Sequence, residues 1–311
     1  MKAVRYYEYG DTQVMRYEDA AQPRPAAGQA LMGVAATSFN AVDSSIRAGY
    51  LQQQMPVRFP HTPGIDVAGT VADLGEGVTG LNIGDAVIGF LPMNENGAAA
   101  EFVLAPADVL TAAPRRVPLP DAAALPAVAL TAWQALFEHA NLHAGQRILI
   151  NGAGGGVGGF AVQLAKGARA TVIATASPRS TDAVRSDGAD QLVDYTTTAL
   201  TDAIKEPVDV VLNLVRASEQ DMAGLVSLVA PGGVLVTTAS PARDDPARKV
   251  RAISMFVRSD AKDLAAIVAR VDAGDLRIDI SETYPLSDIV LVHEKGAAGQ
   301  FRGKVLLVPT T

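Results

Sequence analysis

The residues best suited to chemistry form a glycine-rich segment, 152–158, which lies between an aliphatic run at 148–150 and an apolar-periodic run at 160–166. A strand, a tight glycine turn and a helix start are what dinucleotide binding requires. Such a turn lets the backbone approach a pyrophosphate, and the N–H groups and the positive dipole end of the helix hold the phosphates. The predicted phosphate-contacting residues are Ala153, Gly154, Gly155, Gly156, Val157 and Gly158.

The segment after the next predicted strand, 170–174, bears on the identity of the cofactor. Residues 175–181 contain no Asp or Glu. An acidic residue here would accept hydrogen bonds from the ribose of NAD and would repel a 2′-phosphate. Ser177 can donate to a phosphate oxygen, and Arg179 can form a charge-assisted pair with it. We therefore predict NADP(H) rather than NAD(H). The alternative is that Arg179 is a solvated charge that opens the next helix.

The composition is that of a globular protein long enough for two domains. The chain has 311 residues, of which 49% are hydrophobic and 19% are charged. Its formal net charge of -7 gives no indication of a nucleic-acid-binding surface. The absence of cysteine excludes disulfides, thiolate zinc sites and a cysteine nucleophile. The four histidines show no metal-ligand spacing.

Targeting signals and membrane spans are not indicated by the sequence. The first six residues lack the apolar core of a signal peptide, and no apolar run reaches membrane-spanning length. We therefore expect a cytoplasmic protein with no membrane association and no nucleic-acid partner.

Two patterns divide the chain and predict an α/β fold with a second, β-rich domain. Up to about residue 116, short β-like runs alternate with tight-turn signals, which is typical of a partly closed β-domain. Asp121 is the predicted cap of an alanine-rich helix that reaches His139. From Arg147 onward strands and helices alternate, which predicts a doubly wound parallel sheet. The predicted domains are 1–117, 118–258 and 259–311, and we expect the closing strand at 304–308 to rejoin the first domain.

Several short motifs, in order and nearly end to end, match one known family. They are Met1–Val4, Phe39–Asp43, Pro63–Gly69, Gly84–Val87, Leu130–Trp133, Gly152–Gly158, Gly188–Asp190, Pro231–Gly233 and Arg302–Lys304. The chain resembles the zinc-free quinone oxidoreductase (zeta-crystallin-like) branch of the medium-chain dehydrogenase/reductase superfamily. That resemblance implies a GroES-like catalytic domain and a Rossmann NADP-binding domain. It also implies a C-terminal segment that returns to the first domain, an active cleft between the domains and a homodimer.

The resemblance also bears on metal content. Zinc-dependent relatives place Cys, a His-Glu pair and a second Cys at the catalytic metal. The corresponding positions here carry Asn40, Ile65-Asp66 and an apolar stretch near Ala127. These groups make a poor zinc site, and we expect no metal. Without zinc, hydride transfer requires an acceptor that is already electrophilic, which means a quinone or an alkene conjugated to a carbonyl.

The candidate catalytic residues are Asn40, Asp43 and Tyr50. The amide of Asn40 can donate to a substrate oxygen, and Asp43 can orient Asn40, the loop or a water; a helix cap or a structural salt bridge is the alternative for Asp43. Tyr50 can line the cleft, where it would donate a proton or stack on a flat ring, or it can simply pack the loop. Several relatives carry a tyrosine at the position of Ser45, and this difference leaves the proton donor open.

Further cofactor contacts are implied by the resemblance alone. Thr131 matches a residue that contacts nicotinamide, and Tyr195 matches a tyrosine that helps to bind the adenosine phosphate. The backbone at Thr238-Ala239 and at Phe256-Val257 is expected to flank the nicotinamide carboxamide. Arg302 and Lys304 are candidates to reach the cofactor from the tail, with ordinary solvated cations as the alternative.

The leading hypothesis is therefore an NADPH-dependent, zinc-independent reductase of quinones. An NADPH-dependent enone or enoyl (alkenal) reductase of the same fold is the runner-up, because both reactions add hydride to a conjugated acceptor. A low-turnover NADPH-binding sensor is the alternative from another class, since one fold supports many uses.

Overall fold

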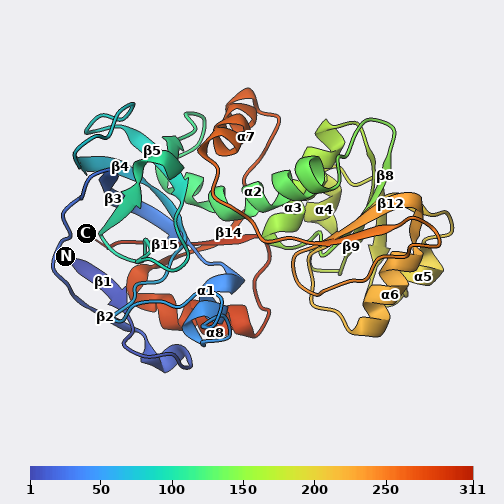
Figure 1. Ribbon diagram of the computed structural model, residues 1–311, viewed down its shortest axis with the longest axis horizontal. Coiled ribbons are helices and arrows are strands. Elements are labelled where there is room, and N and C mark those ends of the chain that lie inside the picture. Colours follow the sequence, from blue (N-terminus) through green and yellow to red (C-terminus); the bar gives the residue numbers. More distant parts are fainter. Residues whose placement is uncertain (311) are drawn as a thin grey trace. The chain divides into compact units, whose positions relative to one another are not determined.

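The computed structural model describes residues 1–310, which divide into two compact units. The first unit comprises Met1–Ala127, Ser259–Gly274 and the segment that begins at Ile278. The second comprises Val128–Arg258 and Asp275–Arg277. The N-terminal strand and the C-terminal strand both belong to the first unit (Figure 1). The predicted boundary lay at residue 117, whereas the structure groups residues 118–127 with the first unit.

The first unit is β-rich. Its larger sheet has the strand order β14-β15-β3-β4-β5-β7, and β6 pairs with β3. These strands are β3 (Gln29–Ser38), β4 (Asp66–Leu74), β5 (Ala86–Phe90), β6 (Phe102–Pro106), β7 (Leu110–Ala112), β14 (Ile280–Pro285) and β15 (Lys304–Val308). A separate antiparallel pair consists of β1 (Lys2–Arg5) and β2 (Arg16–Asp19). The helices of this unit include α1 (Ala41–Arg47), α7 (Ala261–Ala273) and α8 (Ile289–Ala297).

Two apolar clusters hold the first unit together. Alternate residues of β3 and β4, such as Met32 and Val67, meet Val87 and Val103 in one core, as the two-residue period of a strand dictates. The second cluster joins the two ends of the chain, because Val4 and Tyr6 pack with Val305 and Leu307 of β15. Strand β15 is also antiparallel to β3, with Leu306 opposite Ser38. The tail is therefore an integral part of this sheet.

The second unit is built on a six-stranded sheet in which every pairing is parallel. The strand order is β10-β9-β8-β11-β12-β13, and Figure 1 labels β8, β9 and β12. The strands are β8 (Arg147–Asn151), β9 (Thr171–Ala176), β10 (Gln191–Asp194), β11 (Val208–Asn213), β12 (Val229–Thr237) and β13 (Arg251–Ser254). The connecting helices are α3 (Gly156–Gly167), α4 (Thr181–Ser186), α5 (Leu200–Ala203) and α6 (Glu219–Ser227). This confirms the predicted α/β class.

The chain order reverses between β8 and β11, which are neighbours in the sheet. From β8 the strands run outward through β9 to β10, and the chain then returns to β11 and continues to β13 on the other side. Ligands of open α/β sheets bind outside the carboxyl ends of the strands at such a switch point. The glycine-rich turn follows β8 and therefore lies at this point.

The predicted helix from Asp121 to His139 differs from the structure. Leu119–Ala124 forms a 3-10 segment, α2 spans Pro126–Trp133, and Gln134–His139 is π-helical. Proline has no N–H to donate and its fixed φ suits the first helical position, so the α-helix begins at Pro126. Asp121 is therefore not its cap. Within residues 1–310, no helix combines the length and the apolarity needed to cross a bilayer.

Candidate cofactor and catalytic sites

The glycine-rich turn has the local geometry that a pyrophosphate needs. Gly155 is the N-cap of α3, and a Cβ built on it would meet only the Gly152 carbonyl oxygen, at 3.6 Å. Gly152 has a φ of +96°, which favours glycine. A Cβ on Gly158 would lie 2.4 Å from the Gly152 oxygen, so only glycine lets α3 approach the turn this closely. The space beside Gly155 is thus open, while its neighbours fix the backbone that borders it.

The turn between β9 and α4 packs directly against the glycine turn. A Cβ on Gly154 would lie 2.6 Å from the Cβ of Ser180. The Ser180 hydroxyl in turn accepts a hydrogen bond from the Ser177 N–H at 3.0 Å. Ser177 is buried and Arg179 is exposed. The structure therefore brings together the predicted pyrophosphate turn and the predicted 2′-phosphate turn.

Tyr195 lies at the same edge of the sheet. It follows β10, whose Asp194 is opposite Ala176 of β9, and its N–H donates to the Ala176 carbonyl at 3.3 Å. The register therefore places Tyr195 next to the start of the Ser177 turn, and its side chain is 54% exposed. An exposed aromatic ring at this edge is available to a ligand.

The residues predicted for the nicotinamide end follow the other half of the sheet. Thr238 and Ala239 form the turn after β12, and the Thr238 N–H donates to the Asn213 carbonyl at 3.1 Å. Phe256 and Val257 follow β13, and the Phe256 side chain is 58% exposed. Thr131 is buried on α2. The two turns leave the sheet at the carboxyl ends of adjacent strands, as the prediction requires.

The candidate catalytic residues lie in the first unit, where strand pairing gathers several polar side chains. Asn40 follows β3, Asp66 opens β4, and Lys304 opens β15. Both β4 and β15 pair with β3, so these side chains meet at one end of it. Asp66 is fully buried, and Lys304 is 3% exposed.

Asp66 is the centre of this buried network. One carboxylate oxygen, Oδ1, accepts the Ala127 N–H at 2.7 Å. The other, Oδ2, accepts from Asn40 Nδ2 at 2.8 Å, from Lys304 Nζ at 3.3 Å and from the Ser38 hydroxyl. Burial lowers the pKa of Lys304, and the negative charge of Asp66 counteracts that shift. A paired, hydrogen-bonded arrangement of this kind is what allows charges to be buried.

Asn40 is fully engaged by its neighbours. Its amide nitrogen donates to Asp66 and, at 3.3 Å, to the Ser38 carbonyl, and its oxygen accepts from Lys304 Nζ at 2.8 Å. The predicted donation from Asn40 to a substrate oxygen stays a prediction, and it requires that the longer bond to Ser38 be given up.

The same contacts decide whether zinc fits here. The oxygens of Asn40 and Asp66 already bind the ammonium of Lys304, and Asp66 Oδ2 accepts three hydrogen bonds. No thiolate or imidazole donor accompanies them, although zinc sites are built from such ligands. The donor set therefore does not fit a zinc ion.

Asp43 holds a neighbouring turn. It lies in the first turn of α1, and its Oδ1 accepts the Gly64 N–H at 3.1 Å. Gly64 has a φ of +104°, and a Cβ there would lie 2.8 Å from the Thr37 hydroxyl. Burial raises the pKa of Asp43 to about 7, and Asp66 acts in the same direction, while the Gly64 hydrogen bond opposes it. Asp43 thus anchors the Gly64 turn, and a role for it in orienting Asn40 or a water stays a prediction.

Tyr50 and the histidines lie in contrasting environments. Tyr50 follows α1 and is 76% exposed. His61 is buried with its ring 5.2 Å from that of Tyr6, and burial lowers the pKa of His61 to about 4. His293 Nδ1 lies 3.0 Å from the Ser44 hydroxyl, and burial lowers the pKa of His293 to about 3. Both histidines are therefore neutral at pH 7.

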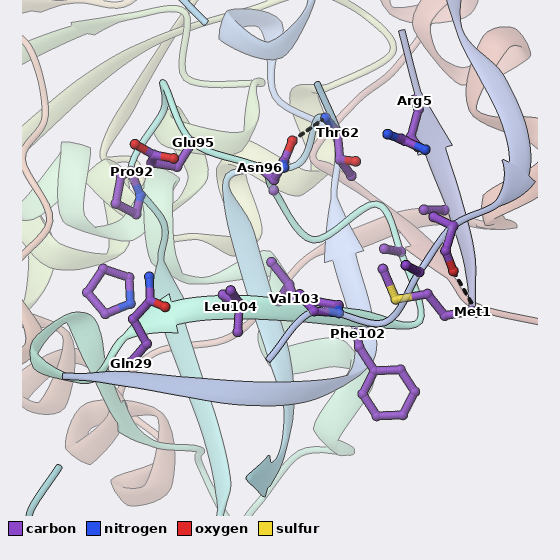
Figure 2. A pocket seen from close by; sticks show the side chains of 17 residues that line it. Met1, Arg5, Gln29, Thr62, Pro92, Glu95, Asn96, Phe102, Val103 and Leu104 are labelled. Atoms are coloured by element: carbon purple, nitrogen blue, oxygen red, sulfur yellow. Dashed lines mark hydrogen bonds between the residues drawn. The ribbon is translucent and has the colours of Figure 1, made fainter. Parts of the chain in front are cut away.

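The first unit also contains a cavity of about 330 Å³ (Figure 2). Arg5, Glu95 and Asn96 are among the residues that line it, and Asn96 Oδ1 accepts the Thr62 N–H at 2.9 Å. Asn40, Asp43 and Tyr50 are not among the residues that line it.

Sequence reasoning missed two features of these sites. The first is the partner of Lys304, which the prediction treated as a tail cation. A charged residue at the start of the apolar run 305–308 was a usable signal, because a charge in a buried strand must be paired. The second is a row of polar residues at the carboxyl ends of four strands: Thr175, Asn151, Asn213 and Thr237.

Comparisons with known proteins agree with this fold. The model of the alcohol dehydrogenase GroES-like domain matches residues 26–115, and that of a zinc-binding dehydrogenase matches residues 188–307. A chloroplast envelope quinone oxidoreductase homolog of Arabidopsis thaliana is 32% identical over 99% of this chain and 98% of its own.

Solved structures agree as well. The structure of the quinone oxidoreductase from Coxiella burnetii has a TM-score of 0.91 at 30% identity and covers 100% of this chain and 99% of its own. A mycobacterial protein complexed with NADPH has a TM-score of 0.87 at 27% identity, over 99% of this chain and 100% of its own. This chain is thus a nicotinamide-dinucleotide-dependent oxidoreductase, and it belongs to the quinone oxidoreductase branch of the medium-chain dehydrogenase/reductase superfamily.

Proposed function

We propose that this protein is a zinc-independent NADPH:quinone oxidoreductase. The observation that carries the cofactor choice is the contact between the open glycine turn and the turn at Ser177–Arg179, in a segment without a carboxylate from residue 175 to 181. A serine hydroxyl and a guanidinium favour a 2′-phosphate, and this segment has no carboxylate to accept hydrogen bonds from the ribose of NAD. Bound NADPH supplies a hydride, and a quinone that accepts it together with a proton becomes a hydroquinone.

The Asp66 network supports zinc independence. Lys304 Nζ binds the oxygens of both Asn40 and Asp66. The ammonium group therefore occupies the oxygens that a metal ion would need as ligands. The acceptor must then be electrophilic without help from a metal, and both a quinone and an alkenal meet that condition. A cytoplasmic homodimer is the form in which we expect the enzyme to act.

The cofactor proposal is tested by Arg179→Ala. Loss of a charge-assisted pair with phosphate costs about 1.5–3 kcal/mol, so the Kd for NADPH should rise about 10- to 100-fold while that for NADH changes little. Arg185→Ala is the matched control, because Arg185 is an exposed arginine of the same helix region that pairs with Asp182 at 3.3 Å. Equal losses for NADPH and NADH in the Arg179 variant would remove the 2′-phosphate assignment.

The acceptor is tested by following NADPH absorbance with a simple quinone, a 2-alkenal, a 2-enone or no acceptor. Oxidation that is fastest with the quinone supports the proposal. Oxidation confined to the alkenal or enone identifies an ene-reductase of the same fold. Tight NADPH binding without turnover identifies a sensor.

A further inference from the structure

Four polar residues form a row across the carboxyl end of the second unit's sheet. Thr175, Asn151, Asn213 and Thr237 come from β9, β8, β11 and β12, which are neighbours in that order. Asn213 is opposite both Asn151 and Thr237 in the strand register. Thr175, Asn213 and Thr237 are each at most 1% exposed. Buried polar groups of this kind need partners, and here they find them in one another.

The hydrogen bonds of the row run in one direction. The Gly152 N–H donates to the Thr175 hydroxyl at 2.8 Å, which donates to Asn151 Oδ1 at 3.2 Å. Asn151 Nδ2 then donates to Asn213 Oδ1 at 2.9 Å, and Asn213 Nδ2 donates to the Thr237 hydroxyl at 3.2 Å. The Thr237 hydroxyl donates to the Ser240 carbonyl at 2.9 Å.

One fixed acceptor sets this direction. Asn213 Nδ2 also donates to the Val215 carbonyl at 2.8 Å, and a carbonyl can only accept. The oxygen of Asn213 therefore faces Asn151 and accepts a hydrogen bond from the Asn151 amide nitrogen. The oxygen of Asn151 then faces Thr175 and accepts from its hydroxyl. Bonds aligned in this way polarise one another and strengthen the chain.

The two ends of the row hold turns with different predicted roles. Gly152 begins the turn proposed for the pyrophosphate, whereas Ser240 closes the turn at Thr238–Ala239 proposed for the nicotinamide end. The Asn213–Val215 bond fixes a third loop, and a Cβ on Gly152 would lie 2.8 Å from Val215 Cγ1. The Ala217 N–H donates to the Ser240 hydroxyl at 3.0 Å, which joins the second and third loops directly.

We propose that Asn213 is a positioning residue that couples the pyrophosphate turn to the turn after β12, so that the two ends of the dinucleotide are held by one connected unit. The identity of the ligand in this inference, a dinucleotide, rests on the proposed function. Thr175 and Thr237 are separated by three strand spacings, which amounts to about 14 Å. Sites that far apart act independently unless a network links them.

The test measures how a substitution in the turn after β12 affects binding of a ligand at the pyrophosphate turn. Thr237→Val removes the hydroxyl near the nicotinamide turn, and the probe is 2′,5′-ADP, which has adenosine and phosphates but no nicotinamide. The Kd for 2′,5′-ADP should rise about three- to tenfold, and Asn213→Asp, which loses the amide donors at nearly constant shape, should reproduce that rise. The control is Thr171→Val, an exposed threonine at the opposite end of β9. An unchanged Kd in the Thr237 variant overturns the inference.

Hydrogen exchange of the free protein provides a readout that needs no ligand. Amides of residues 151–158 should exchange faster in Thr237→Val than in the wild type or in Thr171→Val, because the far end of the row has lost its anchor. Unchanged exchange overturns the coupling. A wild-type protein that fails to bind 2′,5′-ADP contradicts the proposed cofactor instead, and exchange still decides whether the row couples the two turns.

Discussion

At the scale of single residues, the glycines of the phosphate turn are required for different physical reasons. Gly158 is required by packing, since a Cβ would lie 2.4 Å from a backbone oxygen. Gly155 has a φ of −93° and open space around its Cβ position, so neither backbone strain nor a clash at Cβ opposes a side chain there. The difference separates a structural glycine from one that leaves room for a ligand.

This difference leads to a prediction for Gly155→Val. The variant should fold with a stability within about 1 kcal/mol of the wild type, because neither clash nor strain opposes the side chain. Its NADPH affinity should be lost, since the side chain would fill the space proposed for the pyrophosphate. Isothermal titration measures the affinity, and urea denaturation measures the stability.

Gly158→Val is the contrasting variant. Its side chain would collide with the backbone of Gly152 and Ala153, so it should destabilise the second unit itself. A Gly155→Val protein that titrates normally with NADPH would contradict the placement of the pyrophosphate in this turn.

At the scale of elements, β15 closes the first unit through a buried ion pair. Lys304 opens the strand and contacts Asn40, which follows β3, and Asp66, which opens β4. When one partner of a buried pair is removed, an uncompensated charge remains, and the usual cost is about 3–5 kcal/mol. Lys304→Met should lower the free energy of unfolding by that amount.

The pair also predicts a partial rescue. In Lys304→Met with Asp66→Asn, no unpaired charge remains, so the double variant should be more stable than the Lys304 variant alone. Arg302→Met is the control, because Arg302 is a neighbouring tail cation whose partner, Asp279, is 45% exposed; its loss should cost less than about 1 kcal/mol. A Lys304→Met protein as stable as this control would show that the pair does not anchor β15.

The elements were more predictable than the contacts that join them. Alternating apolar runs and turn signals predict the parallel sheet and its glycine turn, because those patterns are local in the chain. The meeting of Asn40, Asp66 and Lys304 depends on the pairing of three strands far apart in sequence, and no local pattern encodes it. Ser38, Asn151 and Asn213 were missed for the same reason, since a polar residue at the end of a strand acquires its role only from the neighbouring strand.

At the scale of the whole molecule, buried titratable groups make stability depend on pH. His61 and His293 remain neutral in the folded protein because burial lowers their pKa values to about 4 and about 3. The unfolded chain takes up these protons near pH 6.5. Their contribution to stability is therefore complete above that pH and is lost as the pH falls toward the folded pKa values.

Asp43 has the opposite effect, because its pKa is raised to about 7. Its contribution is complete below about pH 3.8 and is lost as the pH rises toward 7.

Between about pH 6 and 4.5, the unfolded chain therefore binds two more protons at the histidines and one fewer at Asp43. Together these three groups give a net difference of about one proton, so their contribution should lower the free energy of unfolding by about 1.4 kcal/mol for each pH unit of acidification. Asp43→Asn removes the opposing group, so the slope should steepen by about 1.4 kcal/mol per pH unit, which leaves the histidine contribution of about 2.7 kcal/mol per pH unit unopposed. Urea denaturation at several pH values, followed by tyrosine fluorescence, measures both slopes. All three groups lie in the first unit, whereas the single tryptophan, Trp133, lies in the second, so its fluorescence provides an internal reference. A wild-type stability that instead rises on acidification would mean that the histidines titrate normally in the folded protein and that the raised pKa of Asp43 alone sets the slope.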